Sequence, residues 1–195
     1  MIMTGYRGVT ACFPPVVALP VSLDRDIFLT SLVGELESTL KDTVGPDEAS
    51  GWINAAGERV GERISEGYKS ALAVRELPRA RISEVLVDVS RRVASGYEAL
   101  EEEDDRIVMI NRTCSCGEKG PGHASMCTMT ANVFGAIVAE NLGYARVSLE
   151  RKTIDGVPAC VLHIGLQPSA QAGGQGREYF RGGRPRPAGA SSPSR

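Results

Sequence analysis

The spacing of apolar residues changes along this chain, and that change limits the folds open to it. Three segments in the first half carry apolar residues three and four positions apart, the period of a helix with one buried side. After residue 96 the apolar residues run in short stretches typical of strands, interrupted by one further helical segment. Helices that precede antiparallel strands are typical of α+β domains. We therefore expect an α+β fold, with N-terminal helices packed against a small antiparallel sheet.

Glycine and proline set the expected boundaries of the helices. The first pattern runs from Ser22 to Val44, and Gly45 and Pro46 end it and begin the second. The third helix follows Pro78. Two hairpins and a fourth helix complete the pattern. The strands are expected at 97–101, 106–110, 145–151 and 159–166. Between the two hairpins we expect a cysteine-containing loop and a helix that carries Val133, Phe134, Ile137, Val138 and Leu142.

Four glycines interrupt the second helical pattern, at Gly51, Gly57, Gly61 and Gly67. Each costs a helix about 1 kcal/mol relative to alanine, so their number needs a reason. Two explanations are open at this point. The glycines allow another helix to pack closely, or they leave room for a ligand or a partner.

The chain of 195 residues is long enough for one domain, which we place at residues 21–166. Residues 1–20 read as a flexible extension, since three prolines break the apolar stretch that a secretory signal would need. Residues 167–195 are rich in Gly, Pro and Ser and read as a disordered basic tail, with a short anchor at Tyr179 and Phe180. We expect a cytoplasmic protein.

Charge and hydropathy exclude two classes of partner. The chain has 22 basic and 24 acidic residues, a formal net charge of −2. The tail holds five arginines and one glutamate, so the body is acidic, and this argues against direct nucleic-acid binding by the folded domain. No apolar run approaches the roughly 18–20 residues of a membrane-spanning helix, so we expect no membrane partner.

Four cysteines and one histidine form the main candidate site. Cys114, Cys116 and Cys127 lie in a glycine-rich loop that ends on a helix, His123 lies in the same loop, and Cys160 opens the last strand. Thiolates are ligands for zinc and for iron–sulfur clusters, and both need about four ligands. The spacing does not distinguish the two metals. A second explanation stays open for Cys127 and Cys160, which would then be small buried residues facing each other across helix and sheet.

The segment 106–166 resembles the bacterial methanogen output domain proteins, and more distantly the 4-vinyl reductase class of ligand-binding domains. The shared positions are Cys114, Cys127, Gly135, Gly143, Gly156 and Cys160. With the helical segments upstream, the resemblance covers roughly residues 19–166. It implies an α+β sensory or regulatory domain, a homodimer that works beside transcription regulators and signalling proteins, with cysteines that hold a metal or cluster. The family loop usually runs Cys-Pro-Phe, whereas this chain has Cys114-Ser115-Cys116.

Three functional hypotheses follow. The leading one is a cytoplasmic sensory or regulatory protein with an iron–sulfur cluster, or alternatively zinc, bound by Cys114, Cys127 and Cys160 and completed by Cys116 or His123. Its output would pass to a signalling or transcription-regulator partner. The second is a small-molecule-binding module with structural cysteines or zinc. The third, a cluster-dependent reductase, is less favoured because no flavin or nicotinamide fingerprint is present, so an enzyme is not the expected class.

Overall fold

The computed structural model describes residues 25–93, 95–112, 121–154, 156–168 and 176–182. The helices and strands follow one another in the order α1 to α3, β1 and β2, α4, and β3 to β5. Their bounds are α1 Arg25–Val44, α2 Pro46–Leu72, α3 Arg79–Arg92, β1 Glu98–Glu102, β2 Arg106–Asn111, α4 Pro121–Leu142, β3 Tyr144–Ile154, β4 Val157–Gly165 and β5 Arg177–Phe180. The α+β fold is thereby confirmed.

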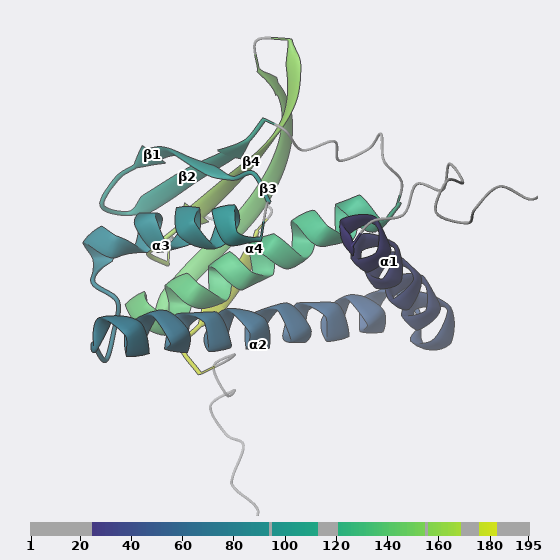
Figure 1. The fold of residues 1–195 in the computed structure, drawn as a ribbon, viewed down its shortest axis with the longest axis horizontal. Coiled ribbons are helices and arrows are strands. Elements are labelled where there is room, and N and C mark those ends of the chain that lie inside the picture. Colours follow the sequence, from purple (N-terminus) through teal and green to yellow (C-terminus); the bar gives the residue numbers. More distant parts are fainter. Residues whose placement is uncertain (1–24, 94, 113–120, 155, 169–175, 183–195) are drawn as a thin grey trace, which may run out of the picture.

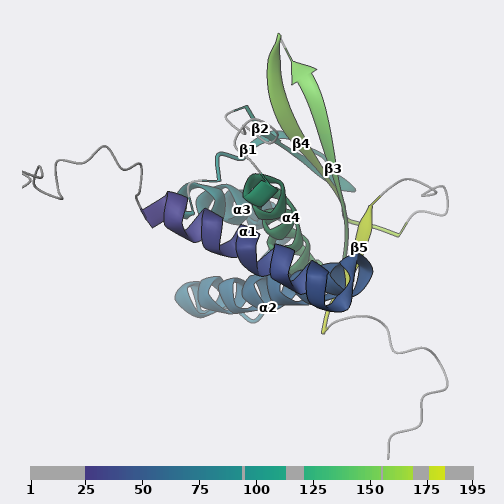
Figure 2. The same ribbon diagram turned by 90° about the vertical axis from the view of Figure 1, so that its right-hand side faces the viewer.

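The helices gather on one side of the sheet, as Figures 1 and 2 show. Helices α3 and α4 lie next to the sheet, α2 lies beneath α4, and α1 crosses the end of the molecule where α2 and α4 both begin. Helix α4 therefore lies between α2 and the sheet and is largely buried from Ala131 onward. Among the described residues, no helix combines the length and the apolar character needed to cross a membrane.

The sheet has the strand order β1-β2-β4-β3-β5, and every neighbouring pair is antiparallel. The two expected hairpins are β1–β2 and β3–β4. Strand β5 pairs with β3, with Tyr179 opposite Ala145 and Phe180 opposite Tyr144. This strand is the expected anchor, and it shows that the domain boundary at residue 166 was set too early, since part of the segment 167–195 completes the sheet.

Helix α1 ends and α2 begins at the expected glycine and proline. Gly45 has a φ of 87°, which favours glycine, and Pro46 occupies the first turn of α2. One helix start differs from the expectation. Helix α4 begins at Pro121, so His123 and Cys127 lie in its first two turns instead of in the loop. The reason is the same as for α2, because proline fits a first helical turn where no intrahelical donor is needed.

Two of the four glycines in α2 explain how closely α2 and α4 pack. A Cβ added at Gly61 would lie 2.6 Å from the Val133 carbonyl oxygen, and one at Gly57 would lie 2.7 Å from the Asn132 Cβ. At Gly51 and Gly67 an added Cβ would meet nothing within 4 Å. Close helix packing is therefore the correct explanation for Gly57 and Gly61, and α4 fills the space that a ligand would have needed there.

Candidate functional site

One expected site residue, Cys160, lies at the end of the sheet where β2 stops. Asn111, the last residue of β2, lies opposite Cys160 of β4. In the β1–β2 hairpin Glu98 lies opposite Ile110. Tyr97 precedes Glu98, so the same register brings it opposite Asn111, on the side of Asn111 that faces away from Cys160. Tyr97, Asn111 and Cys160 thus form a row across three neighbouring chain segments, with about 5 Å between neighbouring Cα atoms. We call this row the Cys160 corner.

Cys160 is a free thiol in the buried core beneath α4. Its residue is 2% exposed, and it belongs to the same apolar cluster as Leu162 and Ile164, which alternate with it along β4 on the helix side of the sheet. Burial raises the pKa of the Cys160 thiol, and the Arg151 guanidinium on the neighbouring strand lowers it by less. The thiol is therefore protonated at neutral pH, and it must lose its proton to bind a metal.

Tyr97 contributes a buried hydroxyl to the same corner. The residue is 3% exposed, and its ring packs edge-on against Phe134 of α4 with 5.9 Å between ring centroids. Its backbone N–H donates to the Ser90 hydroxyl at 2.6 Å, which fixes the residue between α3 and β1. Within the described part of the chain, the Tyr97 hydroxyl has no hydrogen-bond partner. Burying such a group without a partner costs about 1–3 kcal/mol.

The Tyr97 hydroxyl and the Cys160 sulfur lie within electrostatic range of each other. Burial raises the pKa of Tyr97 well above its usual 10.0, and a negative charge on Cys160 raises it further. Both side chains belong to the same buried cluster, together with Phe134. A neutral thiol is a weak hydrogen-bond acceptor, so Cys160 in its protonated form does little to satisfy this hydroxyl.

Cys127 approaches the corner from α4. It is 8% exposed and lies one turn before Ala131, which packs in the same apolar cluster as Cys160. Cys127 is disulfide-bonded, and Cys160 is a free thiol. Both cysteines are buried, Cys127 on α4 and Cys160 on β4, and whether they face each other or share a ligand stays a prediction.

Three of the expected ligands cannot be placed. Cys114 and Cys116 lie outside the described residues, and of His123 the structure describes the backbone in the first turn of α4. Within the ranges that are described, no group of three or more His, Cys, Asp and Glu side chains is arranged to hold a metal ion. The Tyr97 hydroxyl is one of four buried polar side-chain atoms without a hydrogen-bond partner among the described residues.

Residues 28–165 match the family model of methanogen output domain 1. The chain belongs to this family. The match begins four residues into α1 and ends at the last residue of β4, so it includes the whole Cys160 corner and the segment with Cys114 and Cys116. By its description an output domain has a signalling or regulatory role. A search of the curated proteins found no match.

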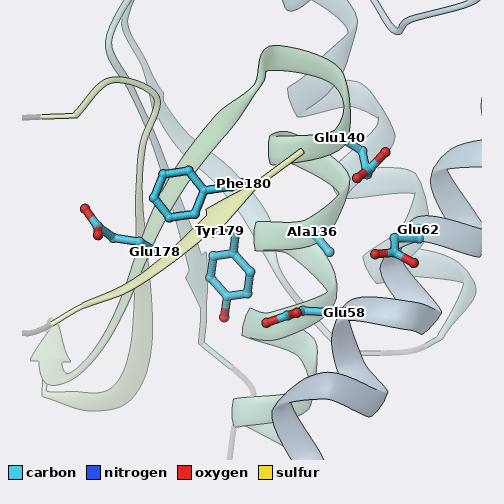
Figure 3. A pocket seen from close by; sticks show the side chains of 7 residues that line it. All are labelled: Glu58, Glu62, Ala136, Glu140, Glu178, Tyr179 and Phe180. Carbon is cyan, nitrogen blue, oxygen red and sulfur yellow. The ribbon is translucent and has the colours of Figure 1, made fainter. Parts of the chain in front are cut away.

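The methanogen output domain of this chain has a second polar site that the sequence did not suggest. A shallow pocket lies where β5 meets α2 and α4 (Figure 3). Three of its glutamates hold β5 and the residues around it. Glu58 pairs with Arg177 at 2.6 Å, Glu178 accepts from the Tyr144 hydroxyl at 2.7 Å, and Glu140 accepts from the Gly182 N–H at 2.8 Å. This pocket is therefore explained by the attachment of β5.

Sequence reasoning also missed Tyr97 in this methanogen output domain. In the sequence, a tyrosine that precedes a strand is typical of an ordinary core residue. What distinguishes Tyr97 is its register beside Asn111 and Cys160, and that register depends on pairing between distant segments. His163, by contrast, lies away from the corner. It alternates with Cys160 to the opposite face of β4, where its Nε2 lies 3.3 Å from the Glu150 carboxylate.

Proposed function

We propose that this methanogen output domain is a redox-responsive regulatory domain whose cysteines hold an iron–sulfur cluster or, alternatively, a zinc ion. The ligands in this proposal are Cys127 and Cys160 with Cys114, completed by Cys116 or His123. The observation that carries it is the register of Asn111 opposite Cys160, because β2 ends there. The segment with Cys114 and Cys116 begins two residues after Asn111 in the chain.

Chain connectivity supports a shared site. Cys114 follows Asn111 by three residues, so its Cα lies within about 11 Å of the Asn111 Cα, at 3.8 Å per residue. The Asn111 Cα is in turn about 5 Å from that of Cys160. Cys127 lies on α4 one turn before Ala131, which belongs to the same apolar cluster as Cys160. Metal sites with four ligands can take these ligands from separate segments of the chain that the fold holds close together.

The disulfide of Cys127 supports the redox part of the proposal. A sulfur in a disulfide cannot act as a thiolate ligand, so bonded Cys127 and metal-ligating Cys127 are mutually exclusive states. A bound metal or cluster supplies bonds that tie α4 and β4 to the segment between β2 and α4. An oxidant such as glutathione disulfide would take two electrons from two of these thiolates, release the metal and leave a disulfide at Cys127, with Cys160 as a free thiol. Reduced thiols persist in the cytoplasm, which is where such a site would operate.

The site is tested by metal analysis of the full chain purified without oxygen in the presence of a reductant. We expect close to one iron–sulfur cluster or one zinc ion per chain, with visible absorption in the case of the cluster. Cys160→Ser should lower the bound metal at least tenfold. His163→Gln is the matched control, since His163 lies on the opposite face of the same strand and should leave the metal content unchanged. Wild-type protein that contains neither iron nor zinc would rule out the site.

The homodimer belongs to the same proposal, and α1 supports it. Apolar residues cover a broad face of this helix, yet none of its residues whose exposure is described is buried. Phe28, Leu32 and Leu36 form an outer stripe with exposed fractions of 55%, 44% and 61%. We call it the α1 stripe. At these exposed fractions each side chain leaves on the order of 100 Å² of surface accessible to water. Ile27, Leu29 and Trp52 are exposed as well, and the exposed apolar surface of all six residues adds up to several hundred Å².

A second copy of this chain fits the α1 stripe. The three residues are evenly spaced around Leu32, so an antiparallel two-fold contact centred there brings Phe28 against Leu36 of the partner subunit. Of the residues beside the stripe, Ser31 and Thr39 are uncharged and Glu35 is charged. Interfaces of stable dimers bury about 800 Å² per partner. The exposed surface of the α1 stripe, taken together with the surface of the residues around it, approaches this area.

The dimer is tested by light scattering after size exclusion on the full chain. Wild type should elute with twice the mass of one chain, and Leu36→Glu should shift it to the monomer mass because it buries a charge. Ser38→Glu is the matched control, since it adds the same charge to an exposed position away from the stripe. Monomeric wild type, or a Leu36→Glu protein that stays dimeric, would contradict this arrangement. The signalling partner then acts on a pair of domains.

A further inference from the structure

The surface beneath β5 is shaped for the side chain at its centre. The Tyr179 ring fills a notch on α4 that depends on Gly135, because a Cβ at that position would lie 2.5 Å from the ring. The Tyr179 hydroxyl donates to Asn132, one turn earlier on α4, at 2.5 Å. The Asn132 amide donates in turn to Asn54 of α2, which fixes its orientation. The notch therefore fits an aromatic ring that carries a hydroxyl at its end.

Two arginines flank this tyrosine and bind carboxylates on the helical side of the sheet. Arg177, two residues before Tyr179, lies 2.6 Å from the Glu58 carboxylate of α2. Arg181, two residues after it, lies 2.6 Å from the Glu76 carboxylate, and it also donates to a backbone carbonyl at the end of α4. The backbone between them pairs with the edge of β3. The surface thus fits an extended chain with the pattern Arg-x-Tyr-x-Arg.

The strand that lies there is held in the way a bound peptide is held. It has four residues at the edge of the sheet, and one of its side chains, that of Tyr179, is buried. The ion pairs on either side join partly exposed groups, and such pairs add little to stability. The surface lies within residues 28–165, which match the family model, whereas β5 follows them. The binding surface and its occupant are therefore separate parts of the chain.

Strand β3 has a longer edge than β5 uses. Strand β5 pairs with residues 144–147, while β4 pairs with the other side of β3 as far as Ile154. On the side of β5, no strand among the described residues pairs with residues 148–154. A separate segment that is longer than β5 can pair with this edge as well, and it gains backbone hydrogen bonds that β5 does not make.

We propose that this surface is a docking site for the signalling partner of the domain, and that β5 occupies it when the partner is absent. We call it the β5 site, formed by residues 144–147 of β3 with Glu58, Glu76, Asn132 and Gly135. The partner's segment is extended and carries a tyrosine with an arginine two residues before and after it. It reproduces the contacts of β5, and its additional pairing with β3 offsets the advantage that β5 has as part of the same chain. The proposal does not depend on a metal at the cysteines.

A labelled peptide with the sequence of residues 176–182 tests the site on the full chain. Fluorescence anisotropy gives its dissociation constant. Tyr179→Ala in the protein empties the notch at Gly135, so the peptide should bind this variant at least tenfold more tightly than wild type, where β5 competes. A peptide that carries Tyr179→Ala itself should bind the variant at least tenfold more weakly than the unchanged peptide. Equal binding of the two peptides would overturn the proposal.

A charge exchange gives a second test, which does not require Tyr179→Ala to fold. Glu58 is partly exposed, so Glu58→Arg leaves the core intact. This variant should bind a peptide with Arg177→Glu more tightly than the unchanged peptide, because the ion pair is restored with its charges reversed. Glu66→Arg is the matched control, since it makes the same charge change at an exposed position further along α2 and should keep the preference for the unchanged peptide. A peptide that binds none of these chains, or a preference that does not invert, would contradict the β5 site.

Light scattering separates a partner from a second copy of this chain. When β5 fills the site of its own chain, Tyr179→Ala leaves the mass of the protein as it is in wild type. When β5 of one copy fills the site of another, the same substitution lowers the mass, because it removes the side chain that anchors the two copies to each other. A lower mass would assign the site to the assembly of this chain with itself and would overturn docking of a partner.

Discussion

Gly61 lies at a point where the backbones of two helices touch. An added Cβ would come within 2.6 Å of the Val133 carbonyl oxygen and 2.7 Å of the Ala136 Cβ, and backbone atoms of α4 cannot rotate away. Gly67 lies on the same helix but faces open space, with nothing within 4 Å of an added Cβ. The two glycines therefore share a helix and a residue type but differ in their surroundings.

Alanine at these two positions should have opposite effects on stability. Gly61→Ala should lower the free energy of unfolding by about 1–3 kcal/mol, because the packed interface must open to admit a methyl group. Gly67→Ala should raise it by up to about 1 kcal/mol, since alanine favours the helix and meets no obstacle. Urea unfolding at fixed pH measures both. Changes of the same sign would show that α2 and α4 do not pack as described.

At the scale of elements, β5 is the clearest case of a strand held by side chains from elsewhere. It has four residues and lies at the edge of the sheet, yet the Tyr179 ring fits over Gly135 of α4, where an added Cβ would lie 2.5 Å from the ring. The Tyr179 hydroxyl also reaches Asn132, whose amide donates to Asn54 of α2 at 2.8 Å. One side chain thus ties β5 to both central helices.

Truncation of that side chain should release the strand. Tyr179→Ala should lower the free energy of unfolding by about 3–5 kcal/mol, as for other buried aromatic residues. Hydrogen exchange of the β3 amides that pair with β5, over residues 144–147, should become faster. Phe180→Ala is the control. Phe180 is only partly buried, so its replacement should lower the free energy of unfolding by less than Tyr179→Ala does. Unchanged exchange in β3 would mean that β5 is held by something other than Tyr179.

The elements that the sequence predicted well are those marked by local signals. Gly45 and Pro46 fix a helix junction within two residues, and alternating apolar residues fix both hairpins. Helix α4 starts earlier than the sequence predicts, because the glycines after Cys116 indicate a loop that would extend beyond Pro121. The partners of β5 and the place of Tyr97 beside Cys160 depend on contacts between distant segments, which periodicity does not encode.

At the scale of the whole molecule, the folded state holds several protons more tightly than the unfolded chain. Burial raises the pKa of the Cys160 thiol above its usual 9.0 and the pKa values of Tyr97 and Tyr179 above their usual 10.0. Burial and a hydrogen bond to Glu178 raise the pKa of Tyr144 to about 12. Each of these groups stabilises the fold fully below its unfolded pKa, and that contribution is lost as the pH rises towards the folded value.

The free energy of unfolding should therefore fall steadily as the pH rises from about 9 to 11. Cys160 responds first because its unfolded pKa is the lowest of these groups, and the tyrosines follow above pH 10. Urea unfolding of the reduced, metal-free protein at pH 8, 9, 10 and 11 gives the measurement. Cys160→Ala should flatten the fall between pH 8 and 10 and leave the later part in place. A free energy that stays constant over this range would contradict the buried thiol and phenols.

The contact at Gly57 and Gly61 has a mechanical consequence. No side chain on the α2 side can rotate there to absorb a displacement, because the glycines bring α2 directly against α4. A shift at the start of α4, where Cys127 lies, is passed to α2 as a movement of one stiff body. Helix α1 leads directly into α2 at Gly45 and follows that movement. Because α1 also crosses the end of the molecule where α4 begins, a displacement of that end of α4 reaches the α1 stripe directly as well as through α2.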